Sequence, residues 1–417
     1  MTTTADIVSH CQALFEDLDF TAARAWKAAK PGRKVVGFMP VYAPLELIHA
    51  AGCLPLGLFG GGDQMEVIHG DAYYQSYICR IPRSTIELGV TRRLDFVDGM
   101  IFPFVCDVIR NLSGMWKLMF PDVWSKFFDT PQNFDPAIGG SYYTVELQEL
   151  REGLEQLTGR KIADDDIRRS IALYNENRRL VREVYAFRAR APWKAPTSEV
   201  YLLMRAGLMM DVEEHSRLLA AYLSAAEAEE RPKRDNVRVA IYGSFCEQPP
   251  LNLIKSIEMA GCYVVEDDYA LVNRFLTADV ATEGDPLEAL ATAYIRHSVE
   301  TSCKYVPKEE DKGKFHIEQI RKAGAEGVIY ATPSFCDPAL LDRPMICHRL
   351  SDAGIPYIAF KYAENSGQMQ PIREQAGTFA DSIKLWSLSH ERYRQGAVHA
   401  PAEGDDRAEL RRDHLEA

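Results

Sequence analysis

The sequence predicts an α/β fold in which two Rossmann-like parallel-sheet domains are joined by a helical segment. In residues 34–142 short apolar runs alternate with helical periodicity, which is typical of parallel strands covered by helices. The same alternation returns in residues 234–390, whereas residues 143–233 have helical periodicity and no strand signal. Because ligands of open α/β sheets bind beyond the carboxyl ends of the strands, we expect a cleft where the two halves face each other.

The N-terminal residues 1–33 are predicted to be helical, and Pro31-Gly32 ends that segment. The first α/β domain, residues 34–142, follows directly. Its predicted strands are short apolar runs bounded by turn residues, and they cover 35–39, 54–59, 96–102 and 126–129. Its predicted helices cover 45–51, 81–90 and 107–119.

The connector, residues 143–233, is predicted to hold three to five helices, and the charged segment 231–236 marks its end. The second α/β domain covers residues 234–390. Its predicted strands are 237–242, 262–265, 327–331 and 355–360, and its predicted helices are 251–260, 286–298, 311–323, 339–352 and 370–387. Residues 391–417 are charged and poor in large apolar groups, which predicts a mobile tail.

Composition excludes several classes of function. The net charge of −12 over 417 residues argues against nucleic-acid binding, because phosphate recognition needs basic surfaces. No apolar run reaches the roughly 18 residues of a membrane span, so no membrane segment is expected. The first residues lack the pattern of a signal peptide, which predicts a cytoplasmic protein. The nine cysteines are therefore expected to be thiols or metal ligands rather than disulfides.

Three cysteines lie where a predicted strand is followed by a predicted helix, namely Cys79, Cys106 and Cys336. Backbone N–H groups at a helix N-terminus stabilise a thiolate and an anionic cluster. Three thiolates from separate loops can hold three corners of an iron–sulfur cube and leave the fourth iron open for chemistry. Zinc fingers and thioredoxin-like exchange are not expected, because the chain has no C-x-x-C pair. For any one of these cysteines taken alone, a buried structural thiol is the commoner alternative.

Five of the other six cysteines lack this position between a strand and a helix. Cys246 competes with the three singled-out cysteines as a ligand, because it also follows a predicted strand and precedes a predicted helix. It is an alternative fourth ligand of an iron–sulfur cluster. The remaining five are assigned to packing or to the surface, and they are Cys11, Cys53, Cys262, Cys303 and Cys347.

Several segments together resemble the 2-hydroxyacyl-CoA dehydratase and benzoyl-CoA reductase family of iron–sulfur subunits. The resemblance extends from about residue 34 to residue 387. The segments that carry it are 37–52, 77–80, 106–111, 333–338 and 354–356. It implies that Cys79, Cys106 and Cys336 bind one 4Fe–4S cluster in the cleft between the two domains.

A narrower resemblance, to the benzoyl-CoA reductase branch of the family, is carried by residues 74–83, 111–116 and 361–370. It implies ATP-dependent, ferredoxin-driven reduction of the ring of an aromatic acyl-CoA, benzoyl-CoA, to a cyclohexadiene carbonyl-CoA in anaerobic aromatic degradation. The implied partners are a homologous second cluster subunit, an ATPase or activator subunit pair, and ferredoxin, in a heterotetrameric enzyme. The sequence contains no G-x-x-x-x-G-K-[ST] phosphate loop, as expected if ATP binds to separate subunits.

Glu46 is the candidate catalytic residue, a proton donor or base at the mouth of the first domain. The alternative is a glutamate placed in the first turn of a helix by the helix dipole. Two other functions stay open at this point. One is a subunit of a 2-hydroxyacyl-CoA dehydratase, which uses the same cluster without net redox. The other is a non-catalytic scaffold subunit.

Overall fold

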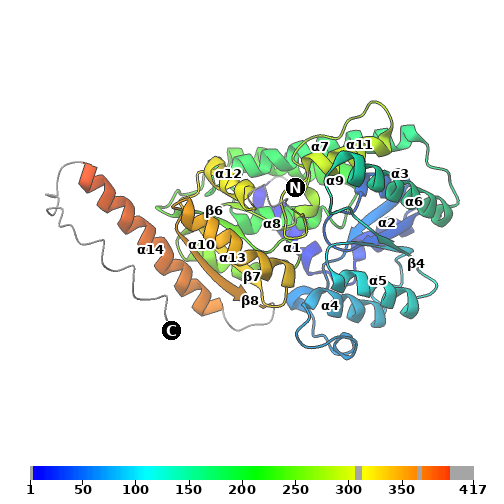
Figure 1. Cartoon of the computed structure of the whole chain (residues 1–417), viewed down its shortest axis with the longest axis horizontal. Helices are drawn as coiled ribbons and strands as arrows, with labels where there is room; N and C mark the ends of the chain where they lie inside the picture. The colour runs from blue at the N-terminus through cyan, green and yellow to red at the C-terminus, as the bar shows by residue number, and fades with distance from the viewer. Residues whose placement is uncertain (1–2, 306–311, 364–368, 395–417) are drawn as a thin grey trace.

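Two four-stranded parallel sheets form the framework of the protein. The computed structural model describes residues 3–305, 312–363 and 369–394. The strand orders are β2-β1-β3-β4 and β6-β5-β7-β8, so the two halves repeat one topology. The α/β class and the two Rossmann-like halves are therefore confirmed. Figure 1 shows the N-terminal half in blue and cyan beside the C-terminal half in yellow and orange.

The elements of the N-terminal half alternate as the periodicity predicts. The strands are β1 (Lys34–Phe38), β2 (Cys53–Gly57), β3 (Gly99–Pro103) and β4 (Trp124–Phe128). The helices are α1 (Thr4–Glu16), α2 (Thr21–Ala28), α3 (Leu45–Ala50), α4 (Arg80–Val90) and α5 (Asp107–Met119), with short helical turns at Gly62–Gln64 and Gly70–Ala72. The predicted strand over 96–102 begins later, at Gly99. Phe96 and Val97 are buried ahead of the strand, and an apolar run does not distinguish a buried loop from a strand.

Residues 141–228 form four helices between the two sheets. They are α6 (Ser141–Thr158), α7 (Asp164–Arg190), α8 (Thr197–Ala206) and α9 (Val212–Ala228), and a short π-helical turn, Pro136–Gly140, precedes them. The helix α7 has 27 residues, which corresponds to a length of about 40 Å. It packs against α3 of the first half and against β6 of the second half, so it spans both.

The C-terminal half repeats the alternation. The strands are β5 (Val237–Tyr242), β6 (Cys262–Asp267), β7 (Gly327–Pro333) and β8 (Tyr357–Tyr362). The helices are α10 (Leu251–Met259), α11 (Pro286–His297), α12 (Lys314–Ala323), α13 (Asp337–Asp352) and α14 (Met369–Arg394), with a short turn at Leu271–Asn273. The last helix continues beyond the predicted residue 387 to Arg394. The rest of the predicted tail, residues 395–417, lies outside the described residues.

Two buried ion pairs fix α7 to both halves. Arg178 pairs with Glu46 of α3, and Arg188 pairs with Asp267 at the end of β6. Arg188 is fully buried and also lies over the ring of Tyr185. A buried charge without its partner is strongly destabilising, so these pairs hold the two halves in one relative position. No described helix combines the length and the apolar character needed to cross a membrane.

Candidate functional site

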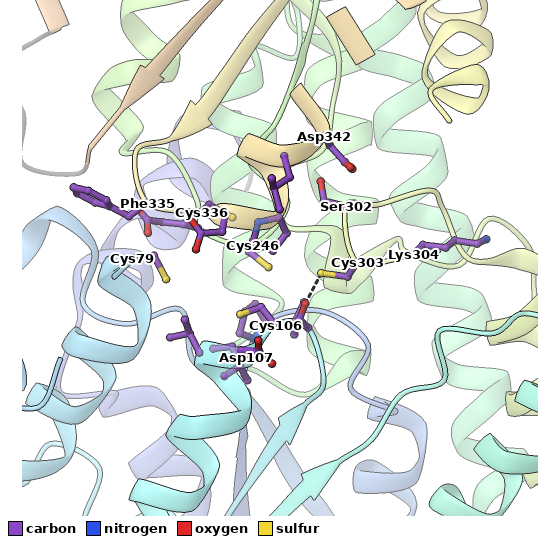
Figure 2. A pocket seen from close by; sticks show the side chains of 18 of the residues that line it. Cys79, Cys106, Asp107, Cys246, Ser302, Cys303, Lys304, Phe335, Cys336 and Asp342 are labelled. Atoms are coloured by element: carbon purple, nitrogen blue, oxygen red, sulfur yellow. Dashed lines mark hydrogen bonds between the residues drawn. The ribbon is translucent and has the colours of Figure 1, made fainter. Parts of the chain in front are cut away.

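A cavity of about 1000 Å³ lies at the carboxyl ends of the strands, between the two halves. Five cysteines line it, and they are Cys79, Cys106, Cys246, Cys303 and Cys336. Figure 2 shows their thiols turned toward a common space, with Cys106 below and Cys336 above. The order of the strands explains the position of the cavity. In each sheet the second strand in chain order lies on one side of the first strand, and the third strand lies on the other side. Ligands of open α/β sheets bind at the point where the strand order reverses in this way.

The three cysteines that the sequence singled out have one local structure in common, since each is the N-cap residue of a helix. Cys79 precedes α4, Cys106 precedes α5 and Cys336 precedes α13. Backbone N–H groups of the first helical turn lower the pKa values of these thiols, and they belong to Ile81, to Val108 and Ile109, and to Ala339. Three helix N-termini therefore point positive ends at one cavity, which favours an anionic group there.

Burial opposes ionisation of the same thiols. It raises the pKa of Cys106 to about 11 and raises the pKa values of Cys79 and Cys336 as well, while the backbone N–H groups act in the lowering direction. Thiolates gathered in one cavity also repel one another. A metal centre bound to sulfur overcomes both effects, because coordination deprotonates a thiol outright.

The donor set fits a cluster of several irons and does not fit a single ion. Among the described residues, no three His, Cys, Asp or Glu side chains lie close enough together to hold one metal ion. An iron–sulfur cube is bound differently, because each thiolate contacts its own iron at a separate corner. Thiols on three separate helix N-termini around one cavity match that requirement.

Two further thiols lie in the cavity. Cys246 follows β5, as the sequence indicated, and burial together with the neighbouring Cys303 raises the pKa of its thiol. The Cys303 thiol donates to the backbone oxygen of Val105, with an Sγ–O distance of 2.5 Å. The assignment of Cys303 to packing or to the surface agrees with its half-buried position against the core, but it did not indicate that Cys303 lines the cavity. Cys303 lies in the segment between α11 and α12, and no strand precedes it, so the pattern that marked the other cysteines was absent.

Glu247, next to Cys246, is a buried acid in the cavity that sequence reasoning missed. Its carboxylate accepts a hydrogen bond of 3.1 Å from the backbone N–H of Arg80. Burial raises its pKa to about 7, against the lowering effect of Arg80 and Arg83. The signal in the sequence was its place in the loop after a strand, one residue beyond a candidate ligand. Nothing in the sequence alone indicated that the loop is buried.

The loop that carries Cys246 and Glu247 is fixed by its own half. Asp268 accepts hydrogen bonds from the backbone N–H groups of Gly243 and Ser244, at 2.6 and 3.0 Å. The amide of Gln248 donates to the backbone oxygen of Cys246 at 3.2 Å. Gly243 has a φ of +107°, and a Cβ there would lie 2.7 Å from the backbone oxygen of Ala331, so this turn requires glycine.

Glu46, the candidate catalytic residue, lies elsewhere. It is buried and ion-paired with Arg178, and it lines a small pocket with Tyr174 and Asn177 rather than the large cavity. Its catalytic role stays a prediction. The ion pair shows that α7 contacts this glutamate directly, which the sequence did not indicate.

The rim of the cavity combines apolar and cationic side chains. Phe335, Leu341 and Met345 line it and are exposed. Lys304 and Lys312 line it as well. Lys304 Nζ donates to the backbone oxygen of Ser298 at 2.9 Å, and Lys312 pairs with Asp342 at 2.8 Å. Asp107, Asp337 and Asp342 line the cavity too, so the opening presents apolar surface beside charged groups of both signs.

The chain is similar to a known family and to several known proteins. Residues 40–383 match the family described as 2-hydroxyglutaryl-CoA dehydratase, D-component. The chain is 67% identical over 384 residues to a benzoyl-CoA reductase subunit of Thauera aromatica, which covers 92% of this chain and 100% of that protein. It is 26% identical to the beta subunit of lactoyl-CoA dehydratase of Anaerotignum propionicum, over 90% of this chain and 100% of that protein. It is 27% identical to the beta subunit of (R)-2-hydroxyglutaryl-CoA dehydratase of Acidaminococcus fermentans, over 84% and 93%. The chain therefore belongs to the 2-hydroxyglutaryl-CoA dehydratase D-component family.

Proposed function

We propose that the chain is the iron–sulfur subunit of an ATP-dependent, ferredoxin-driven benzoyl-CoA reductase. The observation that carries the proposal is the identity of 67% with a benzoyl-CoA reductase subunit over nearly the whole chain. The cavity supports it, because three N-cap cysteines gather where the two sheets meet. The reaction is the addition of two electrons and two protons to the aromatic ring, which yields a cyclohexadiene carbonyl-CoA.

In this proposal Cys79, Cys106 and Cys336 hold one 4Fe–4S cluster. The bound cluster supplies single-electron transfer at low potential. The protein contributes helix N-termini that stabilise the sulfur ligands, and a largely apolar cavity around them. Cys246 and Cys303 are not needed for these three corners.

Glu247 is the residue that we assign to proton supply. A raised pKa of about 7 keeps a substantial fraction of its carboxyl protonated at neutral pH, as a general acid requires. It lies in the cavity with Cys79 and Cys336, so an acid stands next to the proposed site of electron transfer. Glu46 has no comparable access, because the large cavity does not reach it.

The substrate is an aromatic acyl-CoA. A cavity of about 1000 Å³ lies at the upper end of the roughly 300–1,000 Å³ that small-molecule sites occupy. Apolar lining residues such as Ile78 and Phe335 suit a ring and a pantetheine chain. The cations at the rim, Lys304 and Lys312, suit the phosphates of coenzyme A.

The partners in this proposal are a homologous second cluster subunit, an ATPase or activator subunit pair, and ferredoxin, together in the cytoplasm. The chain has no phosphate loop, which is compatible with ATP binding to the separate pair. The relatives of this chain are themselves described as subunits, which supports an assembly of several chains.

The test is purification of the chain with its partners in the absence of oxygen. We expect iron and sulfide in the preparation, and conversion of benzoyl-CoA to a cyclohexadiene carbonyl-CoA with reduced ferredoxin and ATP. If benzoyl-CoA stays unchanged in a preparation that contains the cluster, the proposal that benzoyl-CoA is the substrate is contradicted. A preparation of this chain without iron or sulfide favours a scaffold role, with the active cluster on the partner.

A 2-hydroxyacyl-CoA dehydratase subunit is the second candidate, and the family match and the dehydratase relatives favour it. The two functions differ in stoichiometry. A reductase consumes two electrons and stoichiometric ATP for each product. A dehydratase needs only a brief activation and then turns over without net redox.

A further inference from the structure

Two of the five cavity thiols have no part in the three proposed cluster corners. Cys246 comes from the loop after β5, and Cys303 comes from the segment between α11 and α12. The other three thiols lie at the N-termini of the helices that they begin. Cys246 and Cys303 instead interact with each other. Figure 2 shows these two side chains turned toward one another.

The two cysteines differ in access. Cys246 is buried and Cys303 is half-buried. The main chain on either side of Cys246 is held by Gln248 and by Ser244, whose hydroxyl donates to the backbone oxygen of Ala331 at 2.9 Å. One thiol is therefore fixed in place, and the other reaches it from a separate segment and opens onto the cavity. An oxidant in the cavity can therefore reach one thiol, and the second thiol stands where it can close a disulfide with the first.

We propose that Cys246 and Cys303 form a modification site, a thiol pair that a peroxide oxidises reversibly to a disulfide. In the first step the Cys303 sulfur attacks one oxygen of hydrogen peroxide, the O–O bond breaks, and a sulfenic acid and one water form. In the second step the Cys246 sulfur attacks the Cys303 sulfur, and the hydroxyl leaves as a second water with the Cys246 proton. Each sulfur loses one electron overall, and the peroxide takes up both.

Closure of the disulfide has a structural consequence at the neighbouring loop. The Cys303 thiol donates to the backbone oxygen of Val105, the residue before Cys106. A disulfide has no S–H group, so this hydrogen bond between the two halves is lost on oxidation. A dithiol reductant restores both thiols and the hydrogen bond.

The experiment uses the full chain in its anaerobically purified complex. Hydrogen peroxide is added stepwise, free thiols are alkylated, and tryptic peptides are analysed by mass spectrometry without reduction. Each cysteine of the pair is the single cysteine of its tryptic peptide, in residues 239–255 and 297–304. We expect these two peptides to become linked first, and dithiothreitol to separate them again.

Two cysteine variants test whether the linked peptides depend on Cys303. In Cys303→Ser, Cys246 is expected to stay open to alkylation after peroxide. In Cys262→Ser, which changes a buried cysteine at the start of β6 outside the cavity, the linked peptides are expected to form as in the unmodified protein. Linkage of either thiol to Cys106 or Cys336 in comparable amount overturns the proposal, and so does full alkylation of both thiols after peroxide. Neither readout uses ring reduction, so this test is independent of the proposed function.

Discussion

The carboxylate of Glu247 accepts a hydrogen bond from the backbone N–H of Arg80 at 3.1 Å, and this contact joins the two halves of the protein across the cavity. Arg80 is the first residue of α4, directly after Cys79. The acid that we assign to proton supply is therefore fixed to the helix whose N-cap is a proposed cluster ligand. Any shift between the halves alters the proton source and the sulfur ligand together.

Replacement of a proposed ligand tests the cluster directly. In Cys79→Ser, Cys106→Ser and Cys336→Ser, we expect iron and sulfide in the purified complex to fall toward background, because a hydroxyl is a poor substitute for a thiolate on iron. The matched control is Cys53→Ser, at a buried cysteine on β2 outside the cavity. Iron retained at the level of the control in all three variants contradicts the ligand assignment.

Glu247→Gln tests proton supply. The amide keeps the shape and accepts the N–H of Arg80, but it has no acidic proton. We expect normal iron content and ring reduction slower by about 10²–10⁴-fold, the usual contribution of a general acid. The rate of the unmodified enzyme should fall as pH rises through about 7, because the carboxyl is then ionised. A variant that reduces benzoyl-CoA at the full rate excludes this role.

The pairing of Glu46 with Arg178 predicts a structural effect. Arg178→Leu leaves a buried carboxylate unpaired, and Glu46→Leu leaves a buried guanidinium unpaired, so each is expected to lower the free energy of unfolding by about 3–5 kcal/mol. The double variant should be more stable than either single variant, as urea unfolding would show. If Glu46→Gln folds stably yet loses ring reduction while Arg178→Leu retains it, the catalytic prediction for Glu46 is supported instead.

Asp268 predicts a pH dependence of stability. Burial raises its pKa from 3.8 to about 7, so between these values the folded state holds one more proton than the unfolded state. The free energy of unfolding therefore falls as pH rises through this window, by about 1.4 kcal/mol per pH unit from this carboxyl. Asp268→Asn removes the titration, and we expect the variant to gain stability relative to the unmodified protein between pH 5 and 7.

Urea unfolding at pH 5, 6, 7 and 8 measures this difference. Asp63→Asn, at an exposed position, is the matched control and should show a constant difference. A constant difference for Asp268→Asn as well would mean that Asp268 is ionised in the folded protein throughout. The hydrogen bonds from Gly243 and Ser244 would then have outweighed burial.

The local pattern of the sequence determined the two parallel-sheet halves and the helical segment between them, because strand and helix periods depend on residues close together in the chain. It also determined that Cys79, Cys106 and Cys336 begin helices, since an N-cap is a local structure. These are the features that placed three thiols at the carboxyl edge of the sheets.

Only the tertiary structure decided which other residues reach the cavity. The contact of Cys303 with Val105 joins positions 198 residues apart, that of Glu247 with Arg80 joins positions 167 apart, and the ion pair of Arg178 with Glu46 joins positions 132 apart. Burial of an acid or a thiol depends on the packing of such distant segments, and no local periodicity encodes it. The chain by itself therefore predicts the ligands that begin helices, while the folded protein determines the buried acid, the second thiol pair and the partner of Glu46.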